Sequence, residues 1–270
     1  MSLNIGAALE TGVERSVTSV ALTFVVIVLV LQTVNSIVAS TYVDRYFPRG
    51  NLPSGTNPQS LVNSPVLPYG LVVVAVVSVV FAILTIFVTI AMFRAFVADI
   101  DHVTLDLFTR RGLGAFAHFF ALGVVFFLIA LLNVIPILGT IVFVFLMVSL
   151  WFAPLRIAAA DDGFVSAMRT SWALTKGNRL RLFVLAFVFL VVLGVVDFVL
   201  VTFLRHVPGG FIVNSIVSAY LLVLNVTLTV AAYDQLVDER DAAGEPATQG
   251  GGDDGDDDRN RTPEPTAVGH

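Results

Sequence analysis

Asp197 is the residue with the clearest capacity for chemistry, because it is the single acid within a long apolar stretch, residues 182–204. A charged side chain near the centre of a membrane-inserted helix costs about 2.5–3.5 kcal/mol, so Asp197 should face protein or water. There it could bind a proton or a cation. It could equally be a neutral carboxyl that polar neighbours such as Asn214 or Asn225 satisfy by hydrogen bonding. The sequence leaves both interpretations open.

His118 lies about one turn inside another apolar segment, and we expect it to form a hydrogen bond between packed helices. The four histidines of the chain show no metal-ligand spacing, and no zinc-protease, hydrolase-elbow or phosphate-loop motif occurs. The acidic tail fails the calcium-loop pattern, since counting from Asp253 places Gly255 third and Asp258 sixth. We therefore expect no catalytic residues, no bound metal and no cofactor, in a protein that is not an enzyme.

The most basic stretch of the chain, residues 155–183, holds five of its fifteen Lys and Arg residues. Its middle should form a short amphipathic helix, with Asp162 as the N-cap and with Gly177 and Asn178 as the C-terminal stop. Helical spacing groups four side chains on the expected apolar face: Phe164, Val165, Met168 and Trp172.

Such a helix suits a membrane surface, with its apolar side among acyl chains and its cations among headgroups. Four residues are the candidate headgroup contacts: Arg169, Lys176, Arg179 and Arg181. An ordinary basic cytoplasmic loop is the alternative interpretation of this stretch.

The composition defines the class of protein that must position these residues. The chain is 57% hydrophobic and 13% charged, against about 25% charged in soluble domains. An integral membrane protein is therefore predicted. The net charge of −5 arises mainly from the tail, because eleven of the twenty acidic residues lie from Asp234 onward. Few lysines and an acidic tail suit a salt-loving organism, although GC-rich coding produces the same preference for arginine.

Six apolar stretches are each long enough for a helix to span a bilayer, which takes about 20 residues. They cover residues 17–39, 67–93, 113–134, 137–160, 182–204 and 211–233. The forty-four uncharged residues between Arg111 and Arg156 would form a helix of about 66 Å, so this segment must fold back, at residues 133–139. Arg94 can snorkel at the end of the second span, and Pro154 should kink the fourth.

Charge asymmetry predicts the orientation of the spans. With the N-terminus inside, the inner segments carry twelve Lys and Arg residues and the outer segments three. The predicted fold is thus an all-α bundle of six spans in three hairpins, with amphipathic cytoplasmic connectors, including residues 95–112. Residues 1–238 form the membrane domain, and residues 239–270 form a disordered acidic cytoplasmic tail.

Two short segments carry a family resemblance: Phe-Ala-Pro-Leu at residues 152–155, and AMRTSWALTKGN at residues 167–178. They resemble the membrane domain associated with glycerophosphodiester phosphodiesterases and related uncharacterised six-helix membrane proteins of bacteria and archaea. The resemblance implies a six-span fold and a membrane location. It does not extend to the catalytic barrel of that family, because the tail is short and has no βα pattern.

These features favour a non-enzymatic module in the plasma membrane, with a structural, lipid-interacting or partner-binding role. The expected partners are membrane lipids and a protein partner or a second copy of the chain, with no nucleic acid. A small-solute or ion transporter that works through Asp197 is the alternative.

Overall fold

A computed structural model of the chain describes residues 4–46, 66, 68–135, 137–204, 207 and 209–242. Within these ranges every regular element is a helix, which confirms the all-α fold class. Residues 243–270 of the predicted disordered tail, residues 47–65 of the expected first outer loop, and the side chain of Asp197 lie outside the described residues. Residues 40–46 and 239–242 are helical, because the first and last long helices extend beyond the predicted spans.

Six helical segments of the described chain are long and apolar enough to cross a membrane. Four of them are formed by α2 (Ser19–Tyr46), α3 (Leu71–Val97), α9 (Arg179–Leu204) and α10 (Gly210–Ala242). The third joins α5 (Gly112–Ala130) to a short 3₁₀ helix, and the fourth, residues 138–159, joins α6 (Leu138–Ser149) to α7 (Ala153–Ala159). Valine is abundant in these segments although it is a poor helix former. A helix still forms, because lipid offers no hydrogen-bond partners and the backbone must satisfy itself.

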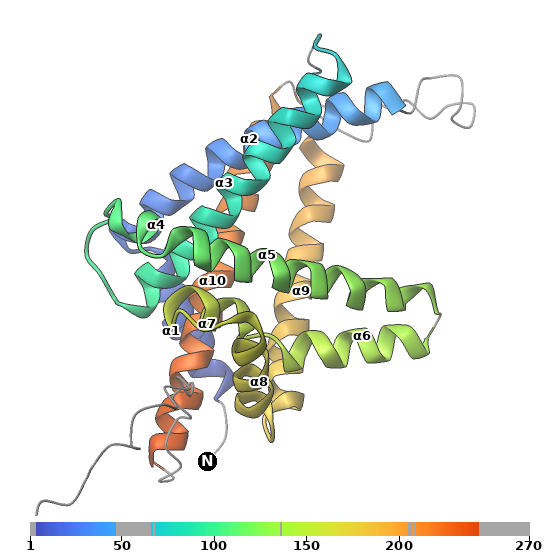
Figure 1. Cartoon of the computed structure of the whole chain (residues 1–270). Helices are drawn as coiled ribbons and strands as arrows, with labels where there is room; N and C mark the ends of the chain where they lie inside the picture. The colour runs from blue at the N-terminus through green and yellow to red at the C-terminus, as the bar shows by residue number, and fades with distance from the viewer. Residues whose placement is uncertain are drawn as a thin grey trace, which may run out of the picture.

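The spans pair in chain order as α2 with α3, α5 with α6 and α9 with α10, which gives the three predicted hairpins (Figure 1). The shorter helices α1 (Ile5–Ser16), α4 (Asp106–Thr109), α7 (Ala153–Ala159) and α8 (Phe164–Thr175) gather at one end of the bundle. We call this end the basal end. From it the paired spans diverge as separate arms.

The largest buried cluster explains why the spans converge near the basal end. It combines the first half of α2, the last half of α3 and the middle of α10, with Leu155 and Ala158 of α7. Phe24 is fully buried there and lies 6.0 Å from the Phe96 ring. The opposite half of α3 is exposed along Val72, Val76 and Val80, as expected for a surface that faces lipid.

Helix α1 lies outside the six spans and packs along the basal part of α10. Gly12 permits this close approach, because a Cβ atom at that position would lie 2.5 Å from the Leu228 side chain. The Thr227 hydroxyl donates a hydrogen bond to the Gly12 carbonyl at 2.8 Å, and Arg15 pairs with Asp234 at 2.8 Å. The N-terminal amphipathic segment is therefore bound to the last span.

The fourth span differs from the prediction of one continuous helix with a kink at Pro154. It breaks at residues 150–152 into α6 and α7, and Pro154 lies in the first turn of α7 rather than within a helix. Proline fits a first helical turn because its missing N–H would have no intrahelical partner there. Residue 154 thus begins a new helix after the break.

The turn between α5 and α6 lies where the sequence placed it. The short 3₁₀ helix η2 (Leu131–Val134) precedes it, and Gly139 follows. Gly139 is required by space, since a Cβ atom there would lie 1.8 Å from the Leu132 carbonyl oxygen.

Within the expected amphipathic connector, residues 95–97 continue α3 and residue 112 begins α5, and residues 98–111 are helical only over the single turn of α4. Four apolar side chains of this connector are nevertheless partly buried against the largest cluster: Ile100, Val103, Leu107 and Phe108. This segment has few backbone hydrogen bonds of its own, and the Arg94 side chain holds it in place by donating hydrogen bonds to its carbonyls.

Candidate membrane-interface site

The basic stretch forms α7, α8 and the start of α9 at the basal end, but α8 begins differently from the prediction. Its N-cap is Gly163, with no side-chain cap. The Asp162 carboxylate instead pairs with Arg156, at 2.8 Å from Nε and 2.7 Å from Nη2. The Asp162 cap prediction is therefore wrong, since a nearby guanidinium offers the stronger, two-pronged partner. The predicted stop is present, with Gly177 at a φ of +94°.

The predicted apolar face of α8, which was expected to lie among acyl chains, is divided in the structure. Phe164 and Met168 pack against a buried cluster, but Val165 and Trp172 are exposed. The fully buried positions follow helical spacing and are mostly small: Ala167, Ser171, Leu174 and Thr175. Small side chains occupy this face because α8 lies close against α6 and α7.

Ser171 and Thr175 satisfy the backbone that the break between α6 and α7 leaves without helical partners. Both hydroxyls donate to the Ser149 carbonyl, at 3.0 and 3.3 Å, and the Phe152 N–H donates to the Ser171 oxygen at 3.2 Å. Non-helical backbone at membrane depth requires such partners. The two hydroxyls therefore hold α8 against the broken span.

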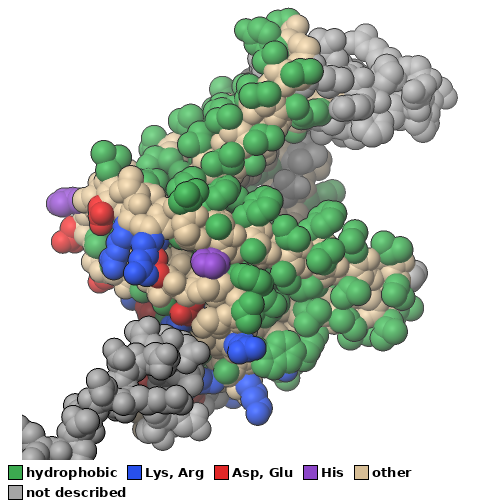
Figure 2. Space-filling model, in the orientation of Figure 1, with side chains coloured by type: hydrophobic (Ala, Val, Ile, Leu, Met, Phe, Trp, Pro, Cys, Tyr) green, Lys and Arg blue, Asp and Glu red, His purple; other side chains and the backbone are tan. Residues whose placement is uncertain are grey.

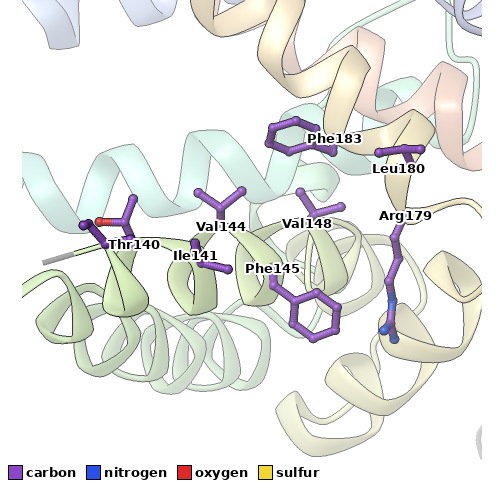
Figure 3. A pocket seen from close by; sticks show the side chains of 9 residues that line it. Thr140, Ile141, Val144, Phe145, Val148, Arg179, Leu180 and Phe183 are labelled. Carbon is purple, nitrogen blue, oxygen red and sulfur yellow. The ribbon is translucent and has the colours of Figure 1, made fainter. Parts of the chain in front are cut away.

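Arg179, the first residue of α9, lies between aromatic side chains of two other helices. Its Cζ atom is 4.3 Å from the Trp172 ring of α8 and 4.9 Å from the Phe145 ring of α6. The two rings meet edge to face at 5.6 Å. Figure 3 shows the Arg179 side chain extending past Phe145 at one end of a groove between α6 and α9.

The other candidate headgroup contacts surround this arginine in sequence. Arg169, Lys176 and Arg181 are all exposed. On the face shown in Figure 2, charged side chains gather at the basal end, while the arms are covered by hydrophobic side chains. Arg240 of α10 approaches the same region by donating a hydrogen bond to the Ala173 carbonyl.

Arg94 forms a second basic centre, where the sequence predicted only a snorkelling side chain. It is 8% exposed, and its Nε donates to the Ala158 carbonyl at 2.7 Å. One terminal nitrogen donates to the Leu107 and Arg110 carbonyls at 3.0 and 2.6 Å, and the other pairs with Asp161 at 3.1 Å. Arg94 therefore joins α3, α4 and α7 into one unit.

The predicted intramembrane polar residues separate into two places. Asn214 and Asn225 line one pocket of about 430 Å³ between α9 and α10. In the part of the chain that is described, the buried Asn214 Oδ1 accepts no hydrogen bond. His118 lies elsewhere, on α5, with its ring 6.4 Å from the Phe164 ring of α8. The asparagines are thus brought together, and His118 is not part of their pocket.

Ser171, Thr175 and Arg94 hold helix junctions together, a role that was not predicted from the sequence. A usable signal existed for the first two, because Ala167, Ser171 and Thr175 recur every four residues and mark a face for close helix packing. No comparable signal marked Arg94, since its partners are backbone carbonyls distant in sequence.

The fold and its charge distribution define the class: a polytopic α-helical membrane protein with its polar contacts concentrated at one end. Within that class, the chain belongs to the family described as "Domain of unknown function (DUF7847)", whose model matches residues 3–236. No curated protein and no solved structure matches the chain. The expected link to the glycerophosphodiester phosphodiesterase membrane domain therefore has no support from these comparisons, and only the six-span membrane fold is retained.

Proposed function

We propose that the protein is a non-enzymatic, membrane-embedded module that binds anionic lipid at its basal end. The observation that carries this proposal is the junction of α8 and α9. There, three exposed cations flank Arg179, for which the described residues offer two aromatic rings and no carboxylate partner. Phosphate groups supply the countercharge that Arg179 lacks among the described residues, and each basic residue near an anionic surface contributes about 1 kcal/mol.

The proposal includes an orientation in the plasma membrane, with the basal end and both termini in the cytoplasm. The excess of basic residues in the basal segments supports it. Because the chain has no cysteine, single substitutions can report the side. Asn4→Cys should be protected from a membrane-impermeant maleimide in intact cells, and Val207→Cys should be labelled. The opposite pattern would reverse the orientation.

Thermal unfolding of the detergent-purified chain tests the lipid proposal. Phosphatidylglycerol should raise Tm more than phosphatidylcholine at the same concentration, because a ligand that binds only the folded state stabilises it. The variant with Arg169, Lys176, Arg179 and Arg181 all changed to Gln should lose that difference.

Arg110→Gln with Arg111→Gln is the matched control, since these exposed cations precede α5 rather than α9. The control should keep the response to phosphatidylglycerol. Equal responses to both lipids in the wild-type chain would refute the proposed function, and a loss in the control alone would move the site to the α4–α5 side.

The pocket between α9 and α10 favours a second candidate function, the transport of a small solute or ion. Its support is the buried Asn214 oxygen, which accepts no hydrogen bond from the described residues and lies beside a pocket in the apolar part of the molecule. Proteoliposomes should then show solute flux that falls in Asn214→Ala and Asp197→Asn but not in Asn133→Ala, a polar residue in the α5–α6 turn. Flux that is absent from the wild-type chain over a panel of solutes would reject transport.

A further inference from the structure

A groove of about 740 Å³ runs between α6 and the first two turns of α9. It is apolar along its length, with side chains from Ile137 at one end to Val148 at the other, and Leu180 and Phe183 complete it from α9 (Figure 3). Arg179 is the one charged residue that lines it. A groove of this kind suits a long apolar chain that ends in an anionic group.

The length of α6 relates this groove to one leaflet of a bilayer. Its twelve residues extend about 18 Å at 1.5 Å per residue. Half of a hydrocarbon core is about 15 Å deep, so α6 alone is too short to cross a bilayer but matches the reach of acyl chains in one leaflet. The break after Ser149 sets this length, because it ends α6 beside Arg179.

Arg179 is not neutralised within the described chain. It belongs to none of the ion pairs among the described residues, and its buried Nε donates no hydrogen bond there. Stacking on Phe145 and Trp172 stabilises the cation and fixes its position, but a ring face carries no net charge. A phosphate would provide both the charge and the acceptor oxygens that a guanidinium binds well.

We propose that this groove holds one acyl chain of an anionic phospholipid from the bilayer leaflet at the basal end, with the lipid phosphate bound to Arg179. This inference rests on the proposed function and narrows it from a charged surface to a single lipid site. Trp172 and Phe145 then act as positioning residues, which hold the guanidinium at the mouth of the groove.

Native mass spectrometry of the full chain, with phosphatidylglycerol or phosphatidylcholine added, tests the site. The wild-type chain should retain one phosphatidylglycerol after excess lipid is removed, and about tenfold less phosphatidylcholine. Ile141→Trp and Thr140→Trp should each reduce retention of both lipids by filling the groove. Arg179→Gln should remove the preference for phosphatidylglycerol and leave retention similar for the two lipids.

Val76→Trp is the matched control for the groove, because Val76 of α3 is 58% exposed and Ile141 is 61% exposed. Arg110→Gln is the matched control for charge at an exposed position, since Arg110 precedes α5 and lies outside the proposed site. Both controls should retain phosphatidylglycerol as the wild-type chain does.

The outcomes separate this inference from the proposed function. If both groove-filling variants retain phosphatidylglycerol normally while the fourfold Gln variant does not, binding is confined to the surface and the groove proposal is wrong. If the wild-type chain retains one lipid of either type equally, the anionic part of both proposals is wrong. If no lipid is retained with defined stoichiometry, the groove is not a lipid site.

Discussion

Two arginines at the basal end have opposite surroundings. Arg94 joins α3, α4 and α7 through three backbone carbonyls and Asp161, so its charge and its donors are satisfied within the chain. Arg179 joins α6, α8 and α9 through two aromatic rings, without a carboxylate among the described residues. Both side chains lie at helix junctions, yet one centre is complete and the other is not.

The difference distinguishes a structural cation from a cation that is available to a ligand. A buried charge is tolerated when partners and hydrogen bonds surround it, and removing one member then leaves the others unsatisfied. A cation held only by ring faces keeps most of its capacity for an anion. The Arg94 junction should therefore determine stability, and the Arg179 junction should determine binding.

Arg94→Ala should produce the largest loss of stability, about 3–5 kcal/mol, because it leaves Asp161 and three carbonyls without their buried partner. Thermal unfolding of the purified chain in detergent, followed by circular dichroism, measures the effect.

Arg169→Ala is the control for this substitution, since Arg169 is exposed and should be near neutral. Arg94→Lys should recover little of the lost stability, because a single ammonium group cannot donate hydrogen bonds to all the partners that the planar guanidinium reaches. Similar unfolding curves for Arg94→Ala and the wild-type chain would show that Arg94 does not stabilise the fold.

Combining Ser171→Ala with Thr175→Val should have an intermediate effect, about 1–3 kcal/mol, because the Ser149 carbonyl and the Phe152 N–H lose their partners. The same unfolding assay applies. Ser166→Ala in the same helix is the control, since Ser166 makes none of these hydrogen bonds. An effect no greater than that of the control would mean that the break is held in another way.

Arg179→Gln should have the smallest effect on stability, about 0.5–2 kcal/mol, which is the range of cation–π contacts. The Phe145 and Trp172 rings can still pack against each other in this variant. Unfolding measured without added lipid isolates this contribution. A loss as large as that of Arg94→Ala would erase the distinction between the two junctions.

The sequence was sufficient for the features that depend on local composition. Long apolar stretches predicted six spanning segments, and the turn residues around Gly139 predicted the reversal between α5 and α6. The connector was expected to be amphipathic, and Ile100 and Leu107 are partly buried against the largest cluster, although most of that connector is not helical. These predictions hold because solvent preference and chain reversal are determined within a few residues.

The remaining features depend on contacts between distant segments. The break at residues 150–152 is stabilised by hydroxyls about twenty residues later, so no property of the fourth span alone reveals it. Asp162 was predicted to cap α8, because a capping preference considers only the helix that follows. It pairs instead with Arg156, six residues earlier in the chain. The aromatic setting of Arg179 requires Phe145 and Trp172 to meet, which follows from the packing of α6 on α8.

The docking of α1 on α10 has a consequence for how the protein is made. The hydrogen bond from Thr227 to Gly12 joins residues 215 positions apart. At a synthesis rate of about 5–20 residues per second, α1 waits roughly 10–40 s before its partner helix exists. During that interval α1 cannot use α10 to cover its apolar face. The contact between the first and last helices therefore cannot form until the final span has been synthesised.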